Sequence, residues 1–288
     1  MENNVVLSMK GICMTFPGVK ALENVDFHLK KGEIRALMGE NGAGKSTLIK
    51  CLTGVNKFEA GEIYLDGIEG SIVNKDTMDA QKKGISTVYQ EVNLCPNLSV
   101  AENLFIGREP MTKIGTVNRK KMNAMAAKLM KDLDLDIDVT QNLEEYSLAL
   151  QQMIAIARAV DMDCKVLILD EPSAGLDPAG RKSLLGNIRA YHRQTGATVV
   201  MVSHSMDEVA ENVDRIVVLA NAGVVMSGTP HEVFSRAQEL IDVGLNVPQV
   251  TQVAMALARQ GVEIDPAVYT VADLRRALNG LKGGRSGC

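Results

Sequence analysis

The chain has 288 residues, of which 46% are hydrophobic and 23% are charged, and its formal net charge is −4. This length and composition predict a globular protein with a sizeable core. The acidic balance and the 3% share of aromatic residues argue against a dedicated nucleic-acid binder, which needs a basic surface and stacking side chains. We therefore expect no nucleic-acid partner.

Five cysteines are scattered along the chain without any C-x-x-C pair: Cys13, Cys51, Cys95, Cys164 and Cys288. This spacing predicts neither a zinc site nor a disulfide framework, and it suits a reducing cytosol. The N-terminus lacks a basic segment followed by an apolar stretch, so we expect no signal peptide. No apolar run approaches the roughly 20 residues of a membrane span. We expect a cytosolic protein whose membrane association, if any, comes through a partner.

The first 90 residues are predicted to be rich in β-structure. Residues 5–38 contain short apolar runs separated by turn signals at Pro17-Gly18 and Lys31-Gly32. Further strands are expected at 62–66 and 85–89.

A helical pattern follows, from Ser99 to about residue 160. Ser99 and Glu102 have the spacing of a capping box, and apolar residues recur at helical spacing over 122–133. We expect a helical subdomain over about 91–160, inserted between strands of the core sheet.

The next part of the chain alternates strands with helices. Continuous apolar runs at 165–169 and 198–202 predict strands that are buried on both faces of a parallel sheet. A helix is expected between them over 179–194, ending at Gly196, and a hairpin is expected around residues 221–223.

Two further capping-box patterns, Ser205 to Glu208 and Thr229 to Glu232, predict helix starts. Residues 236–288 are expected to form a helical C-terminal extension with a flexible tail.

A glycine-rich segment, Gly39 to Thr47, fits G-x-x-x-x-G-K-[ST] at every required position. It follows an apolar strand at 33–38 and precedes a helix predicted at 48–53, which is the context that this pattern needs. Glycines let backbone N–H groups turn inward around phosphates, and the helix N-terminus adds partial positive charge. The segment therefore predicts a nucleoside triphosphate site. The residues assigned to it are Gly39, Glu40, Asn41, Gly42, Ala43, Gly44, Lys45, Ser46 and Thr47.

Chemical roles follow from residue type and position. Lys45 is expected to reach the β- and γ-phosphates, Ser46 to ligate Mg²⁺, and Thr47 to bond near the α-phosphate. Asp170 and Glu171 end a buried strand, where paired carboxylates are costly unless an ion or a substrate uses them. We assign Asp170 to Mg²⁺ and Glu171 to polarising the attacking water as a general base.

Taken in order, these motifs resemble the ATP-binding subunit of an ABC transporter over about residues 5–235. The resemblance implies the α/β class, a P-loop NTPase of the ABC ATPase type with an antiparallel β subdomain, an inserted helical subdomain and a small helical C-terminal region. It assigns Phe16 to stacking on adenine and Gln90 to sensing Mg²⁺ and facing the permease. It also makes Ser147 the signature serine and His204 the switch histidine that touches the γ-phosphate.

The resemblance also implies partners. In that family two nucleotide-binding domains close head to tail, each ATP lies between one P-loop and the other domain's signature loop, and closure drives a membrane permease. For this chain it implies a nucleotide-binding domain at 1–235 with ATP and Mg²⁺ as cofactors. The implied partners are a second nucleotide-binding domain and permease transmembrane subunits, and the implied location is peripheral, on the cytoplasmic face of the cell membrane.

The signature departs from the family's L-S-G-G-Q pattern, because here it is Tyr146-Ser-Leu-Ala-Leu150. Leu148 and Ala149 replace both glycines, and their side chains restrict how closely the backbone can approach a γ-phosphate. A homodimer carries this change in both sites and a heterodimer carries it in one, so both pairings stay open. A nucleotide-binding regulator with slow turnover is a further alternative, although Lys45 and Glu171 are intact. Soluble relatives that act on DNA or ribosomes need insertions or fusions that do not fit a helical insertion of this size.

The two halves of the chain resemble different subfamilies. Residues 1–172 are similar to sugar-importer ATPases, whereas the chain from Ser173 onward is similar to ATPases of energy-coupling-factor (ECF) importers for vitamins and transition metals. The surface expected to face the permease, from Gln90 to about residue 160, lies in the half that resembles sugar importers. This favours a sugar-type permease, with the ECF type as the alternative. A natural mosaic, a recombinant and a designed sequence all fit this division.

Overall fold

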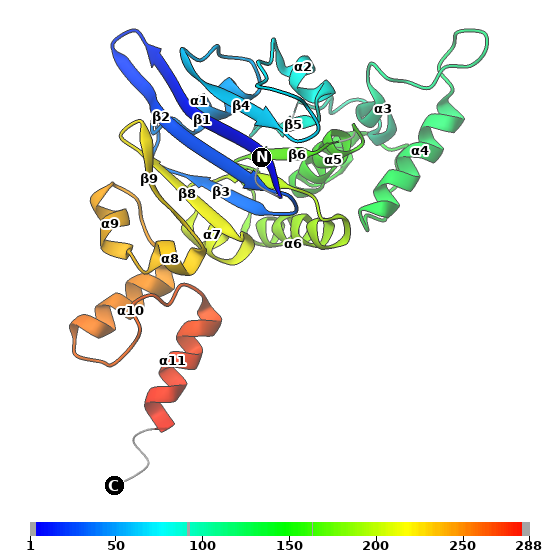
Figure 1. The fold of residues 1–288 in the computed structure, drawn as a ribbon. Helices are drawn as coiled ribbons and strands as arrows, with labels where there is room; N and C mark the ends of the chain where they lie inside the picture. Colours follow the sequence, from blue (N-terminus) through cyan, green and yellow to red (C-terminus); the bar gives the residue numbers. More distant parts are fainter. Residues whose placement is uncertain (1–3, 91–92, 163, 284–288) are drawn as a thin grey trace. The chain divides into compact units, whose positions relative to one another are not determined.

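The computed structural model describes residues 4–90, 93–162 and 164–283 (Figure 1). The described residues up to Asn74 and from Val200 onward form one compact unit, and those between Lys75 and Val199 form another. The tail predicted at the end of the chain, including Cys288, lies outside the described residues, as do positions 91 and 92, the expected start of the helical subdomain.

The first unit opens with an antiparallel sheet in the order β2-β1-β4. Its strands are β1 (Val5–Phe16), β2 (Val19–Lys30) and β4 (Ala60–Leu65). Alternate residues of the second half of β2 are buried, as expected for a strand with one face on the core. The predicted turn at Pro17-Gly18 joins β1 to β2, and this sheet is the antiparallel β subdomain that the sequence predicted.

A second set of strands in this unit follows the order β7-β3-β8-β9. They are β7 (Val199–Val202), β3 (Ile34–Met38), β8 (Arg215–Ala220) and β9 (Gly223–Gly228). β3 runs parallel to β8, and all five of its residues are buried. β8 and β9 form the predicted hairpin, whose two turn residues, Asn221 and Ala222, have positive φ values of 50° and 62°.

One charge lies inside β3, a strand that the sequence pattern describes as apolar. Arg35 is fully buried, and its Nε donates to Glu33 Oε1 at 2.8 Å. Burial lowers the pKa of the Arg35 guanidinium, and the neighbouring Glu33 opposes that shift. The guanidinium of Arg35 is therefore buried together with the carboxylate of Glu33, and a buried ion requires a partner of this kind.

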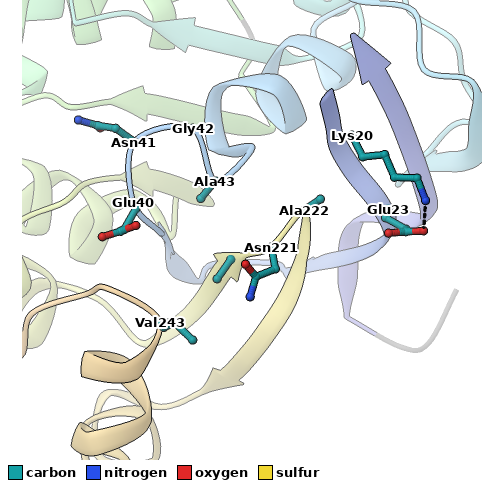
Figure 2. A pocket seen from close by; sticks show the side chains of 10 residues that line it. Lys20, Glu23, Glu40, Asn41, Gly42, Ala43, Asn221, Ala222 and Val243 are labelled. Atoms are coloured by element: carbon teal, nitrogen blue, oxygen red, sulfur yellow. Dashed lines mark hydrogen bonds and ion pairs between the residues drawn. The ribbon is translucent and has the colours of Figure 1, made fainter. Parts of the chain in front are cut away.

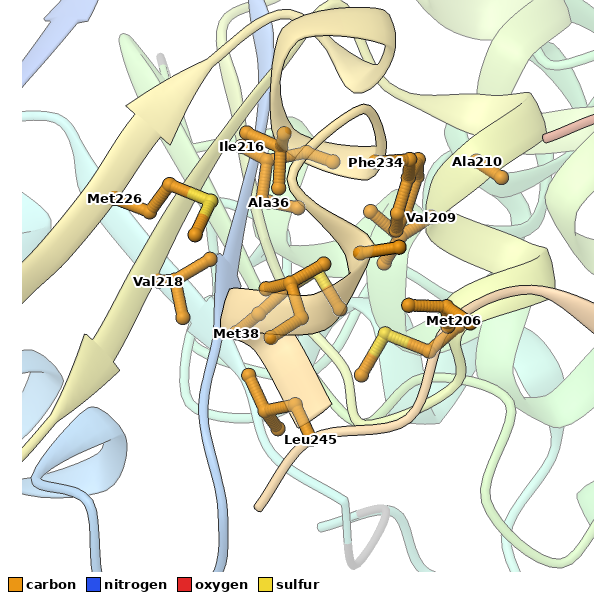
Figure 3. Packing of buried hydrophobic residues seen from close by; sticks show 14 residues of the cluster. Ala36, Met38, Met206, Val209, Ala210, Ile216, Val218, Met226, Phe234 and Leu245 are labelled. Atoms are coloured by element: carbon orange, nitrogen blue, oxygen red, sulfur yellow. The ribbon is translucent and has the colours of Figure 1, made fainter. Parts of the chain in front are cut away.

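Three short helices complete this core: α7 (Met206–Asn212), α8 (Pro230–Phe234) and α9 (Ala237–Asp242). Figure 3 shows their apolar side chains packed with those of β3, β8 and β9. The cluster continues through Leu240 and Leu245 to Val247, so the core uses residues beyond position 235. The division of the chain at 235 stays a prediction.

The last two helices are α10 (Gln249–Arg259) and α11 (Val271–Gly283). They share a small cluster of their own, built on Ala254, Ile264 and Val268. A helical C-terminal region is therefore present, as predicted.

The second unit contains two parallel strands, β5 (Ile85–Val88) and β6 (Val166–Asp170). It also contains α2 (Thr77–Lys82) and α6 (Pro178–Thr195). α6 ends where the sequence predicted, because Gly196 has the left-handed φ of 66° that stops a helix.

The helical part of this unit contains α3 (Val100–Phe105), α4 (Arg119–Asp132) and α5 (Leu148–Val160). A one-turn 3₁₀ helix, η1 (Leu143–Glu145), precedes α5. The helices share a buried apolar cluster that includes Leu104. None of the helices in the described ranges combines the length and the apolar character that a membrane crossing requires.

Two of the three predicted capping boxes form, those of Ser99 with Glu102 and of Thr229 with Glu232. At Ser205 the predicted helix start is confirmed, but the predicted capping box is wrong. Ser205 does precede α7, but its side chain accepts no bond from the first turn. Its backbone N–H donates to Ser203 Oγ at 3.1 Å, so the group that a capping box would offer to a glutamate is already bonded.

Candidate functional site

The glycine-rich loop connects β3 to a helix that begins inside the motif. Helix α1 (Lys45–Leu52) starts three residues earlier than the sequence predicted, directly after Gly44, which has a φ of 99°. No side chain caps this end of the helix. The first N–H groups of an α-helix have no partner within the helix, so the start of α1 can offer them to an anion.

Two glycines of the loop are required by space as well as by conformation. A Cβ on Gly44 would lie 2.5 Å from the carbonyl oxygen of Ala21 on β2. A Cβ on Gly39 would lie 2.5 Å from the carbonyl oxygen of Leu219 on β8. Atoms this close must move, so the loop is held between the two strands only while both positions are glycine.

Lys45 lies within this loop. It is 7% exposed, and its Nζ donates to the carbonyl oxygens of Gly39 at 2.7 Å and of Glu40 at 3.0 Å. These bonds hold the ammonium group against the start of the loop, where its charge adds to that of the helix N-terminus. Positive charge beside inward-facing N–H groups is what a phosphate chain requires.

Near the end of α1, Cys51 is buried, and burial raises the pKa of its thiol to about 11. The thiol therefore stays protonated near neutral pH and adds no negative charge to the site. In the first turn of α1, Ser46 is exposed and Thr47 is half-buried.

A cavity of about 420 Å³ adjoins the outer side of the loop. Figure 2 shows loop residues Glu40 to Ala43 on one side, with the tip of the β8–β9 hairpin and the side chains of Lys20 and Glu23 around it. Lys20 Nζ lies 2.6 Å from Glu23 Oε1, and this hydrogen bond raises the pKa of Lys20. The lining residues outside the loop come from distant segments without a motif, so no sequence pattern points to them. Those residues are Lys20, Glu23, Ala220, Asn221, Ala222 and Val243.

Phe16 and His204 belong to the same unit as the loop. Phe16 is the last residue of β1 and is 39% exposed, so its ring is available for stacking. His204 lies two residues after the end of β7, the strand next to β3 in the sheet order, and it is exposed. Because β3 and β7 are neighbours, the glycine-rich loop after β3 and His204 after β7 come from adjacent strands.

Gln90, Asp170 and Glu171 belong to the other unit, where β5 and β6 bring them to one edge. Val88 is paired with Leu169 in this parallel pair, so the residues that follow both strands leave the sheet at the same level. Glu171 has a φ of 48°, a left-handed conformation that is unusual for a residue other than glycine. Backbone strain of this kind is concentrated at functional sites.

Ser147 lies in the same unit and precedes α5, and its Oγ accepts a long hydrogen bond, 3.4 Å, from Leu150 N. The two residues that replace glycines are on the first turn of α5. A Cβ added at Gly175 would lie 3.8 Å from the side chain of Leu148, and a Cβ added at Gly180 would lie 3.5 Å from that of Ala149. The side chains of Leu148 and Ala149 therefore lie next to these two glycines.

The predicted site residues therefore fall into two groups. The loop Gly39–Thr47, Phe16 and His204 are in one unit, whereas Gln90, Ser147 and the pair Asp170 and Glu171 are in the other. That both groups serve one nucleotide stays a prediction, as does the chemical role given to each residue.

The family model described as ABC transporter matches residues 22–174. The chain is 50% identical over 224 residues to the galactofuranose transporter ATP-binding protein YtfR of Escherichia coli, covering 78% of this chain and 44% of the relative. It is 42% identical over 281 residues to the fructose import ATP-binding protein FruK of Bifidobacterium longum, covering 95% and 52%. The chain thus spans about half the length of the curated relatives it matches.

Solved structures with the same fold are also found. The protein cbiO1 from Clostridium perfringens, part of the ABC transporter complex cbiONQ, aligns with a TM-score of 0.71 and 26% identity over 90% of this chain and 98% of that chain. A dimeric ATP-binding cassette bound to ADP and Pi aligns with a TM-score of 0.63 and 26% identity, covering 77% and 98%. These likenesses confirm the predicted fold class.

We expect Gly44→Ala to weaken ATP binding roughly tenfold or more, because the added methyl group must displace β2 at Ala21 and the loop with it. Gly42→Ala is the matched control. Gly42 also has a positive φ, 86°, but nothing lies within 4 Å of its Cβ position. Titration with a fluorescent ATP analogue measures both variants, and an equal loss in the two would contradict the steric explanation.

Proposed function

The chain belongs to the ABC transporter family, and we propose that it is an ATP-binding and ATP-hydrolysing subunit that powers a membrane importer. The observation that supports this most directly is the loop between β3 and α1. It combines two sterically required glycines, an uncapped helix start and a buried lysine in one short segment. This combination is suited to a triphosphate rather than to a neutral ligand.

The proposed chemistry divides between the two groups of residues. Lys45 and the N–H groups at the start of α1 hold the phosphates, and Phe16 stacks on the base. Glu171 accepts a proton from the attacking water, and its backbone has the strained, left-handed conformation that is concentrated at functional sites. His204 and the other domain's Ser147 complete the contacts to the γ-phosphate.

We propose Mg²⁺ as the companion ion. Ser46, Gln90 and Asp170 offer a hydroxyl, an amide and a carboxylate oxygen, and oxygen donors are what Mg²⁺ prefers. When bound, the ion would neutralise charge on the phosphates.

A sugar is the proposed cargo. The names of several relatives refer to galactofuranose, fructose and ribose. The fructose import relative is similar over 95% of the chain, so the similarity includes the C-terminal part whose motifs resemble ECF proteins. That coverage favours a sugar importer over the ECF alternative. Co-purification of the transmembrane subunit distinguishes the two.

The proposed assembly contains two nucleotide-binding domains and permease transmembrane subunits, on the cytoplasmic face of the cell membrane. A dimeric structure among the similar cassettes supports the pairing. Homodimer and heterodimer both remain compatible with the altered signature, and a slow regulator is the remaining functional alternative.

We expect Lys45→Ala to lower kcat for ATP hydrolysis on the order of 100-fold or more, since the charge on the phosphates loses its closest counterion. Glu171→Gln is expected to abolish turnover while ATP still binds, because only the proton acceptor is removed. Lys50→Ala serves as the control, as Lys50 is an exposed lysine of the same helix.

Phosphate release measures all three variants. Wild-type turnover in Lys45→Ala would overturn the assignment of the site. Undetectable turnover of the unmodified protein together with tight ATP binding would support the regulator.

The double variant Leu148→Gly/Ala149→Gly is expected to raise the turnover of the homodimer several-fold, since it removes the side chains that keep the helix start away from a γ-phosphate. Ala124→Gly/Ala127→Gly on α4 places two glycines at exposed helical positions and controls for loss of helix propensity. Unchanged turnover in the first variant would mean that the signature backbone does not limit the reaction.

A further inference from the structure

The connection between α3 and α4 forms a small hairpin. Met111 and Val117 make an antiparallel bridge, and Thr112 N donates to Thr116 O at 2.7 Å. Residues 108–118 are called the α3–α4 hairpin below. It continues directly into α4, which is about 21 Å long at 1.5 Å per residue (Figure 1).

The hairpin exposes apolar side chains at its tip. Ile114 is 85% exposed, more than any other large apolar side chain in the described part of the chain. Met111 and Val117 beside it are 57% and 43% exposed. Single exposed apolar residues are ordinary, whereas three on one short hairpin give this segment an apolar tip that a partner could cover.

The same segment carries a strong positive charge. Residues 108–132, which are the hairpin and all of α4, contain seven basic residues and two acidic residues, Glu109 and Asp132, although the net charge of the whole chain is −4. Two of the basic side chains are paired, Arg108 with Asp161 and Arg119 with Glu102. The other five make no ion pair within the described ranges. They are Lys113, Lys120, Lys121, Lys128 and Lys131.

The lysines of α4 share one face of the helix. Met122, Ala126 and Met130 are buried on the opposite side, within the apolar cluster of α3, α4 and α5. The outward face carries the four lysines together with small residues, Ala124 and Ala127, and all of them are exposed. A flat basic face with few long apolar side chains can lie close to a charged surface.

We propose that the α3–α4 hairpin and the outward face of α4 bind an anionic lipid surface, with Ile114 inserted among the headgroups and the lysines on the phosphates. The proposal rests on the peripheral membrane location given above, and it adds a direct contact with lipid. Each lysine near an anionic leaflet adds electrostatic attraction, and exposed apolar residues add to it.

The hairpin and α4 lie within residues 90 to about 160, the range expected to face the permease, but charge complementarity favours lipid over that protein as the occupant of this part of it. The lysines are spread along both the hairpin and α4 rather than gathered at one point, and a headgroup layer offers an extended field of negative charge. The rest of the chain is net acidic, so binding to an anionic vesicle requires a local surface such as this one.

Flotation of the full chain with vesicles tests the proposal. The probes are phosphatidylcholine vesicles with and without about 30% phosphatidylglycerol, in about 0.1 M salt. We expect binding only to the anionic vesicles and release in about 0.5 M salt. The variant Lys120→Gln/Lys121→Gln/Lys128→Gln should bind roughly tenfold more weakly, and Ile114→Asp should also lose affinity.

Matched controls are available in the first unit. Lys30→Gln/Lys31→Gln/Lys57→Gln removes three exposed lysines elsewhere, and Val271→Asp places the same charge at another exposed apolar position. Both controls should float like the unmodified protein. Thermal unfolding of every variant checks that the fold is kept.

Absence of flotation with either vesicle, or unchanged flotation of the triple glutamine variant, would overturn lipid binding and leave a protein such as the permease as the occupant. ATP hydrolysis is measured separately in lipid-free buffer. A failed lipid interaction with normal hydrolysis therefore leaves the proposed function intact.

Discussion

The tight contact between the glycine-rich loop and its two neighbouring strands is the constraint on which the candidate site depends. The carbonyl oxygens of Ala21 and Leu219 occupy the space that side chains at Gly44 and Gly39 would need. With the loop fixed between β2 and β8, α1 can begin only where it does. The direction of its first N–H groups follows from that start, and so does the position of Lys45. The chemistry proposed for phosphates is therefore a consequence of backbone packing.

The same loop is supported from the C-terminal side. A Cβ at Gly244, in the turn after α9, would collide with the carboxylate of Glu40, so this turn packs directly on the loop. The apolar core reaches Val247, well past the strands that carry the motif. Residues after position 235 thus contribute to holding the loop in place. A substitution there can alter nucleotide binding without touching the nucleotide.

Local sequence signals predicted most of the fold, because turns, glycine positions and apolar periodicity are properties of short segments. The loop from Gly39 to Thr47 is such a signal. The capping box of Ser205 was mispredicted because its backbone N–H donates to Ser203 Oγ instead, which no pattern of spacing reveals. The cavity residues Lys20 and Val243 carry no motif and meet only through tertiary packing. The basic surface of α4 was hidden by the net charge of the whole chain.

Isothermal titration of the full chain with ATP and with AMP, each in the presence of Mg²⁺, tests the central claim most directly. If the loop binds the phosphate chain, ATP should bind on the order of 100-fold more tightly than AMP, since the two ligands share the base and the sugar and differ only in the phosphates that the loop and Lys45 contact. Equal affinities for the two nucleotides would contradict the account, because the loop would then contribute nothing to recognition.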